Sequence, residues 1–481
     1  MNIIALLETL VKGLLEAEEK FLSNPKDLYS LETAVKSSTD ALAAGFMGNI
    51  LTSVNKQIYD SSWRLGKYTV ARNDKRTLIS SVGDIVFDCT YYRKCEDGSF
   101  HYLLEEFMHL GKHERLTEAA ESLMLTEALK TSYEEAAKVL PSKQKITKTT
   151  VMNKVHQIAE NMPLEDIQDK KKIKTLFIEA DEDHVAEQHG RWEPAGGNKS
   201  FMSRLIYIYE YKQELPGVKG KKELVNKYYF SGLYEGTAGV EKMWKEVNDF
   251  IESRYDTDEL ERVYISGDGA SWIKSGAKYI PHALFCADKF HLVKYINSAS
   301  NQMLDESGWV KKELYRLLYK RDKKGFDELT DRMLESASNQ KYVTDLKTYV
   351  MGNWQAVMRT LHNKEVDGCS AESHVSHVLS DRLSSRPKAW SKLGADRMSR
   401  LRCYEKNYGR EKIIDLVKYS RKQRELQRTG TEDIPVKAIR IYDVWQDHRD
   451  KARGYIERMQ ATIPGFTARK IAAIRNGLNE L

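Results

Sequence analysis

The chain reads Thr175-Leu-Phe-Ile-Glu-Ala-Asp181-Glu-Asp183-His-Val185, an apolar run that ends in a cluster of acidic side chains. A second run, Val263-Tyr-Ile-Ser-Gly-Asp268-Gly-Ala270, ends in the same way. Both runs begin with the β-branched, aromatic and aliphatic residues typical of buried strands. Each acid therefore stands where its strand is expected to open into solvent. A third acid, Glu372, lies in a helix-like stretch further along the chain.

Carboxylates brought together from distant segments repel one another unless a cation lies between them. Oxygen ligands without a nearby cysteine cluster favour Mg²⁺ or Mn²⁺. Two such ions held by carboxylates are suited to phosphodiester chemistry, because they activate the attacking oxygen and stabilise the leaving one. Asp181, Asp268 and Glu372 therefore predict nucleic-acid strand chemistry.

The composition is that of a globular protein with 481 residues, of which 41% are hydrophobic and 30% charged. This length predicts two to four domains. No apolar run of about 18 residues occurs, so a membrane span is not expected. The N-terminus lacks a signal-peptide pattern, and the five cysteines form no C-x-x-C pair. The cysteine pattern argues against a zinc ribbon or a disulfide framework and predicts a cytoplasmic protein.

The charge is unevenly distributed. Residues 382–481 hold 24 basic and 12 acidic side chains, whereas the remaining residues hold 52 basic and 58 acidic ones. Such a basic segment is typical of a region that faces phosphate. A solvated, charge-rich helical region is the alternative.

Between residues 174 and 286 the pattern predicts three antiparallel strands, a helix, a strand, a helix and a final strand. This is the element order of a ribonuclease-H-like mixed sheet, so the predicted fold class is α/β with added helical regions. The predicted divisions are 1–75, N-terminal helical; 76–110, a small β-rich module; 111–168, helical, with a candidate DNA-binding helix-turn-helix; 169–292, the first part of the core; 293–362, a helical block; 363–400, a helix with Glu372; and 401–481, a basic helical C-terminal region.

Two short helices, at 131–141 and about 146–158, match a helix-turn-helix, although a plain helical hairpin is nearly as well supported. Ser132 is a predicted N-cap, with Glu135 three residues on. If the motif is a helix-turn-helix, four polar residues of its second helix would face DNA: Thr149, Thr150, Asn153 and Lys154.

The motifs together resemble a known family. They include residues 78–87, residues 178–185, residues 265–273 and the string Gly368-Cys-Ser-Ala-Glu-Ser-His-Val-Ser-His-Val-Leu-Ser-Asp-Arg-Leu-Ser-Ser-Arg-Pro387. The chain resembles the DDE-type transposases of bacterial insertion sequences, particularly the ISLre-type group, which is related to the Mutator-type superfamily. The resemblance implies a ribonuclease-H-like core whose acidic triad is Asp181, Asp268 and Glu372. The resemblance also implies that residues 293–362 are an insertion domain between the last core strand and the helix with Glu372. Asp288 and His291 match the family's aspartate-x-x-histidine string and are expected to support the site without being metal ligands.

Neighbours of the triad have competing interpretations. Asp183 shares the strand face of Asp181, because strand side chains alternate, and is its alternative as a ligand. Glu179 lies on that face as well, and both it and Glu182 are expected to be in solvent.

Arg382 and Arg386 stand about one turn apart after Glu372 and would neutralise phosphate beside the site. Ordinary surface charge is the alternative. Their position next to the acids makes them candidates for DNA binding.

The predicted function is a DNA transposase that uses two Mg²⁺ or Mn²⁺ ions to cut element ends and join them to a target. Its partner is double-stranded DNA, and at least a dimer is expected because two ends must be held together. A non-catalytic, domesticated DNA-binding protein and a hydrolytic nuclease of the same fold are the alternatives.

Overall fold

The computed structural model describes residues 3–111, 114–160, 169–188, 200–217, 222–385 and 388–426, with residues 450 and 454. The chain divides into two compact units, one formed by residues 1–154 and 414–481 and the other by residues 155–413. Each unit is described by itself. Within the described ranges, no helix has both the length and the apolar character that crossing a membrane requires.

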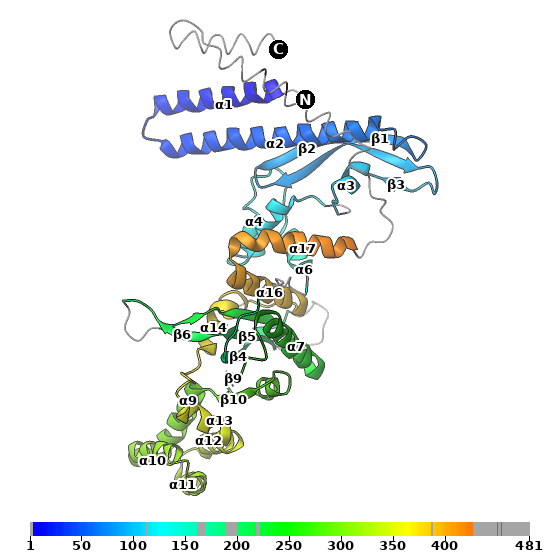
Figure 1. Ribbon diagram of the computed structural model, residues 1–481. Coiled ribbons are helices and arrows are strands. Elements are labelled where there is room, and N and C mark those ends of the chain that lie inside the picture. Colours follow the sequence, from blue (N-terminus) through cyan, green and yellow to red (C-terminus); the bar gives the residue numbers. More distant parts are fainter. Residues whose placement is uncertain are drawn as a thin grey trace. The chain divides into compact units, whose positions relative to one another are not determined.

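The first unit combines a helical hairpin, a β-hairpin and several shorter helices (Figure 1). Strands β1 and β2 pair antiparallel from Tyr68↔Lys94 to Ser80↔Gly83. Strand β1 thus begins before residue 76, where the sequence placed the start of the β-rich module. The elements are α1 (Ile3–Ser23), α2 (Leu28–Asp60), β1 (Tyr68–Ser80), β2 (Gly83–Lys94), β3 (Phe100–His101), α3 (Leu103–Phe107), α4 (Glu118–Ala128), α5 (Tyr133–Ala136), α6 (Lys148–His156) and α17 (Ile413–Leu426).

Helix α2 packs directly on strand β2. Gly48 makes this possible, because a side chain at that position would collide with the backbone oxygen of Val86. Ile58, Ile85 and Phe87 belong to the buried cluster between these elements. Removing their apolar surface from water stabilises the folded unit by about 25 cal/mol per Å² of buried area.

The helix predicted at 131–141 is shorter than expected, since α5 has four residues. Its N-cap is Ser132, as predicted, and the Ser132 hydroxyl accepts a hydrogen bond from the Glu135 amide at 3.1 Å. Whether α5 and α6 act as a helix-turn-helix stays a prediction.

The second unit is built on a five-stranded mixed sheet with the order β10-β9-β4-β5-β8. Strand β4 pairs parallel with β9, and β9 with β10, whereas β5 is antiparallel to both β4 and β8. The predicted mixed α/β class is confirmed. The strands are β4 (Thr175–Ala186), β5 (Ser200–Tyr209), β8 (Tyr228–Gly232), β9 (Arg262–Gly267) and β10 (Ala283–Ala287), and a separate pair is formed by β6 (Tyr211–Glu214) and β7 (Lys222–Val225).

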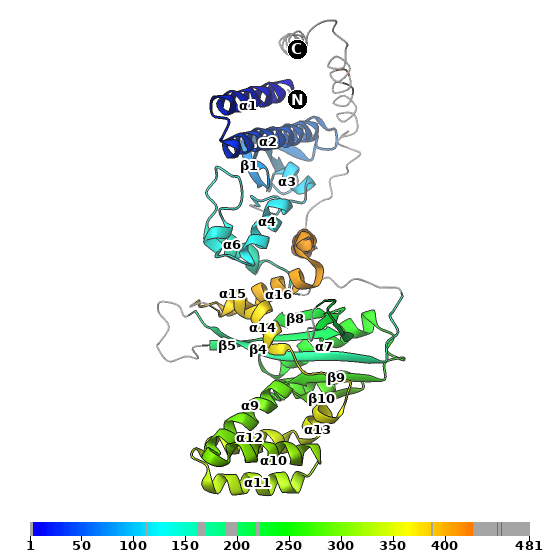
Figure 2. The same cartoon turned by 90° about the vertical axis from the view of Figure 1, so that its left-hand side faces the viewer.

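Successive side chains of β4 point to opposite faces of the sheet, and other elements cover both faces. Leu176, Ile178 and Ala180 belong to the large buried cluster that also contains the apolar residues of α7 (Gly236–Arg254). On the other face lies the helical segment after residue 370, which packs on β4, β5 and β8 (Figure 2). It consists of α14 (Ala371–Val375), a π-helical turn (Ser376–Ser380), α15 (Asp381–Leu383) and α16 (Lys392–Tyr408).

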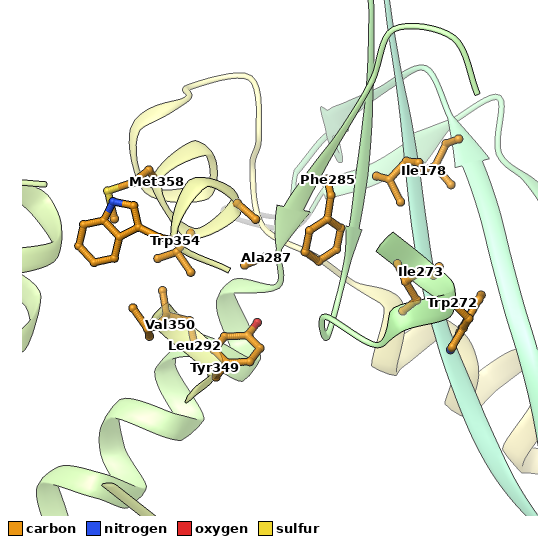
Figure 3. Packing of buried hydrophobic residues seen from close by; sticks show 14 of the residues in the cluster. Ile178, Trp272, Ile273, Phe285, Ala287, Leu292, Tyr349, Val350, Trp354 and Met358 are labelled. Atoms are coloured by element: carbon orange, nitrogen blue, oxygen red, sulfur yellow. The ribbon is translucent and has the colours of Figure 1, made fainter. Parts of the chain in front are cut away.

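Residues 288–370, all of them described, contain helices and no strand. Helix α13 lies along the edge strand β10, where the Thr360 hydroxyl donates to the Ala287 carbonyl at 2.6 Å. Trp354 belongs to a buried cluster that runs from the sheet into this helical block (Figure 3). The helices are α8 (Ser271–Lys274), which precedes the block, and α9 (Lys289–Ser300), α10 (Ser307–Tyr319), α11 (Lys323–Ser336), α12 (Gln340–Gly352) and α13 (Trp354–His362); short 3-10 turns cover Ser275–Lys278, Asn301–Glu306 and Arg410–Lys412.

Candidate functional site

Three aspartates stand at one level on three neighbouring parallel strands. Asp268 and Asp288 directly follow the last residues of β9 and β10, whereas Asp181 lies within β4, which continues to Ala186 and does not end at the acids as expected. The register pairs Glu179 of β4 with Ser266 of β9, and Gly267 of β9 with Ala287 of β10. Asp181 lies two residues beyond Glu179, Asp268 follows Gly267, and Asp288 follows Ala287. The carboxyl ends of parallel strands meet at one sheet edge, which is where α/β proteins bind ligands.

The negative charge of Asp268 acts on the carboxyl group of Asp181. Burial, together with the negative charge of Asp268, raises the pKa of Asp181 to about 6, although a hydrogen bond from the Glu182 amide opposes this shift. A nearby cation would stabilise the ionised form of such a carboxyl group. The pair is therefore suited to holding positive charge.

His291 lies near both acids, at the start of α9. Its Nδ1 is 2.6 Å from the Asp288 carboxylate, and this hydrogen bond raises the pKa of the imidazole, with added effects from Asp268 and Asp181. The second carboxylate oxygen of Asp288 accepts from the Phe290 amide at 2.9 Å. Asp288 thus fixes the histidine and caps the helix.

Glu372 lies in the first turn of α14, and its side chain is exposed. The segment before it is held by Glu179 and Lys212. Glu179 accepts hydrogen bonds from the Ser370 amide at 2.6 Å and the Ser370 hydroxyl at 3.0 Å. The Lys212 ammonium donates to the carbonyl oxygens of residues 367 and 368, both at 3.0 Å. Helix α14 therefore starts at a fixed place over β4.

Glu179 itself is buried, at 1% exposure, which corrects the expectation that it lies in solvent. Burial favours the neutral acid, but the Lys212 charge and hydrogen bonds from Tyr207, Tyr209 and Ser370 outweigh that effect. They hold the pKa of Glu179 below its usual value. Glu179 is consequently an ionised buried group whose charge is compensated.

Asp183 contacts the other end of the same helical segment. Both of its carboxylate oxygens lie 2.9 Å from the Ser384 hydroxyl, just after α15. Its side chain is buried. The structure thus gives Asp183 a partner in the helical segment, while its role as an alternative ligand stays a prediction.

The donor set at the sheet edge is made of carboxylate oxygens, which fits Mg²⁺ or Mn²⁺ in its chemistry. Among the described residues, however, no three His, Cys, Asp or Glu side chains lie close enough together to hold a metal ion. The structure brings Asp181 and Asp268 together without closing a three-ligand site with Glu372. Convergence of all three acids stays a prediction.

The four residues of α6 that were predicted to face DNA differ in how much of each side chain is exposed. Thr149 and Asn153 are exposed, and Thr150 is half-buried. Lys154 does not face solvent, contrary to expectation, because its ammonium group is buried and forms salt bridges with Glu121, at 3.1 Å, and Glu114.

Arg382 is also buried, at 4% exposure, with its guanidinium 4.7 Å from the centre of the Trp390 ring. This placement contradicts its predicted position beside phosphate at the surface. Arg386 lies outside the described residues.

Sequence reasoning missed Glu179, Lys212, Ser370 and Ser384 as residues that position the site. The shared strand face of residues 179, 181 and 183 was visible in the alternation of β4. The serine partners carry no comparable signal, because they are recognised only by spatial contact with acids about 190 residues or more away in sequence.

The structure is that of a mixed α/β protein with aspartates at one level on three parallel strands and a helical block between β10 and the helix of Glu372. The chain belongs to UPF0236, an uncharacterised protein family, whose pattern matches residues 22–420. A UPF0236 protein of Caldanaerobacter subterraneus subsp. tengcongensis is 32% identical over 421 residues, which cover 85% of this chain and 86% of the relative. Another from the same organism is 33% identical over 414 residues, covering 84% and 85%.

The names of these two relatives carry eleven and four locus designations, respectively. Among solved structures, a chain of the Drosophila P element transposase strand transfer complex aligns with 76% of this chain and 92% of its own length. The identity is 10% and the TM-score 0.22. A likeness this weak carries no argument about fold or function.

Proposed function

We propose that this chain is a metal-dependent DNA transposase that cuts the ends of its own mobile element and joins them to target DNA. The observation that carries the proposal is the placement of Asp181 and Asp268 at one level on adjacent parallel strands, where the charge of Asp268 helps to raise the pKa of Asp181. Glu372 would complete the site from α14. Bound divalent ions would supply Lewis acidity to activate the attacking oxygen and stabilise the leaving one.

The sheet supports a ribonuclease-H-like assignment for the core. In the order β8-β5-β4-β9-β10, strand β5 alone runs against the other four. The helical block between β10 and α14 supports the proposal that residues 293–362 are an insertion. In this arrangement Asp181 and Asp268 come from central strands, and the third acid comes from a helix covering one sheet face.

The relatives supply an independent argument. One protein that carries eleven locus designations within a single genome is what a self-copying DNA element would leave behind. A regulator or a housekeeping nuclease has no reason to be encoded so many times.

The test uses purified full-length chain, Mg²⁺ or Mn²⁺, and labelled duplexes taken from the DNA that flanks the chain's own coding sequence. The expected products are strands cut to leave a 3′-hydroxyl and strands joined to a supercoiled target. Cleavage without joining would establish the hydrolytic nuclease instead.

Binding without cleavage would establish the non-catalytic DNA-binding protein, an alternative favoured by the lack of a closed three-ligand cluster among the described residues. Gel filtration of the chain with and without paired ends would test the proposed dimer. A monomer on paired ends would contradict it.

A further inference from the structure

The hydroxyl group of Tyr349 is buried without a hydrogen-bond partner among the described residues. Tyr349 lies on α12 and is 8% exposed, and its ring stacks on Tyr295 of α9 with 4.6 Å between ring centres. A buried donor without a partner is destabilising, and phenylalanine would fill the same space without that cost. The hydroxyl is therefore expected to donate a hydrogen bond when the chain has bound a ligand.

Tyr349 lies against the turn that carries Asp268. Gly269 has a φ of +96°, and a Cβ at this position would be 3.4 Å from the Tyr349 ring. Asn353 lies at the same point, where its amide donates to the Tyr349 carbonyl oxygen at 2.8 Å. Figure 3 shows the Tyr349 side chain with its hydroxyl directed toward the strand end that carries Ala287. The helical block thus supplies one wall of the acidic site.

The acids that act on the Tyr349 hydroxyl are those of the candidate site. Burial, and then the negative charges of Asp288 and Asp268, raise the pKa of Tyr349 well above its usual value. The hydroxyl consequently stays protonated and remains a donor at any physiological pH.

Asp268 has a carboxylate oxygen that can accept a further hydrogen bond. Asp288 uses both carboxylate oxygens, one for the Phe290 amide and one for His291. Asp268 accepts a single hydrogen bond, from the Ala270 amide to Oδ1 at 2.8 Å, and none of the described residues donates to its Oδ2.

We propose that the Tyr349 hydroxyl donates a hydrogen bond to the Asp268 carboxylate when a divalent cation is bound, so that the helical block positions this ligand. The inference rests on the proposed metal site. A carboxylate that holds a cation through one oxygen leaves the other free to accept a hydrogen bond, and such outer hydrogen bonds fix the ligand's orientation. Tyr349 is thus a positioning residue, which explains why a donor is retained in an apolar wall.

The test is Tyr349→Phe in the full-length chain, with Mn²⁺ binding followed by electron paramagnetic resonance. The Kd for Mn²⁺ is expected to rise about 10- to 100-fold, while the melting temperature without metal stays equal or rises. The affinity for DNA without metal should not change. The matched control is Tyr315→Phe, which removes a partly buried hydroxyl from the same helical block and should leave the Kd for Mn²⁺ unchanged.

An unchanged Kd for Mn²⁺ in Tyr349→Phe, with normal binding by the unaltered chain, would overturn the inference alone. A lower melting temperature of the metal-free variant would also overturn it, because the hydroxyl would then have a structural partner. Failure of the unaltered chain to bind Mn²⁺ would overturn the proposed function together with this inference.

Discussion

The Glu179 carboxylate on β4 accepts hydrogen bonds from both the amide and the hydroxyl of Ser370, 191 residues further along the chain. This contact fixes the start of α14 two residues before Glu372. Lys212 neutralises the same carboxylate from 3.2 Å. One buried acid therefore connects the central strand to the helix that carries the third proposed ligand.

Glu179→Gln is expected to leave the Lys212 charge without its buried partner. Loss of one member of a buried ion pair costs about 3 kcal/mol, so the melting temperature should fall. Amide hydrogen exchange at residues 367–375 should speed up more than elsewhere. Glu214→Gln, at an exposed acid on β6, the strand that also carries Lys212, is the control and should change neither property. Unaltered exchange at 367–375 in Glu179→Gln would contradict the positioning role.

Asp268→Asn is expected to abolish Mg²⁺-dependent cleavage, because an amide cannot supply the ligand charge. Binding of end-carrying duplexes should stay nearly unchanged, as measured by gel shift. Asp258→Asn, at an exposed turn aspartate just before β9, serves as the control and should cleave normally. Retained cleavage by Asp268→Asn would remove this residue from the site.

Asp181 is expected to make stability depend on pH. Its pKa of about 6 in the folded chain lies above the value near 3.8 of an unperturbed aspartate. The folded chain thus binds the proton more tightly, so the free energy of unfolding falls as pH rises from about 4 to about 6 and stays lower above that.

Asp181→Asn should remove this penalty. Above pH 6 the variant should be more stable than the unaltered chain by on the order of 1–3 kcal/mol, and the two should converge near pH 4. Chemical denaturation across this range measures the difference. Mn²⁺ at pH 7 should stabilise the unaltered chain more than the variant; a constant offset at all pH values would rule out this origin.

The salt dependence of DNA binding should report on α17. Lys418 and Lys422 are exposed and four residues apart on this helix. If both contact phosphate, replacing both with alanine should reduce the slope of log K against log salt by about 2. End preference should not change, because phosphate contacts carry no sequence information.

The matched control for this prediction is Arg421→Ala on the same helix. Arg421 is largely buried and forms a salt bridge with Glu121. Its loss should lower the melting temperature and leave the salt slope nearly unchanged. Equal slopes for the lysine variant and the unaltered chain would exclude these lysines from phosphate contact.

Much of the core was predictable because its signals are local. Strands β4 and β9 both read as runs of β-forming residues followed by acids, so both strands could be located from pattern alone. The placement of Asp268 after the end of β9 was correct, whereas β4 continues past Asp181 to Ala186. The alternation of β4 also indicated that residues 179, 181 and 183 share a face.

The environment of individual charges was not predictable in this way. Glu179, Lys154 and Arg382 have the sequence context of surface residues, yet each is buried. Glu179 and Lys154 form ion pairs with distant residues of their own units, and the Arg382 guanidinium lies over the Trp390 ring. Burial of a charged side chain depends on contacts that local periodicity does not encode. Convergence of Glu372 with the aspartates depends on the same kind of long-range contact.

The π-helical turn at Ser376–Ser380 lies between two contacts with β4, the hydrogen bonds of Ser370 to Glu179 and of Ser384 to Asp183. It determines how far the helical segment rotates between these two contacts. A turn of this kind accommodates one residue more than an α-helix does. Deleting a single residue there would let the backbone relax to a regular α-helix and leave the rotation between its two ends nearly unchanged. Inserting a residue in the α-helical part, or deleting one there, would instead rotate one end by about 100° relative to the other, so that Glu372 and Ser384 could not both keep their places. The segment should therefore tolerate the loss of one residue at the π-helical turn far better than the same loss elsewhere.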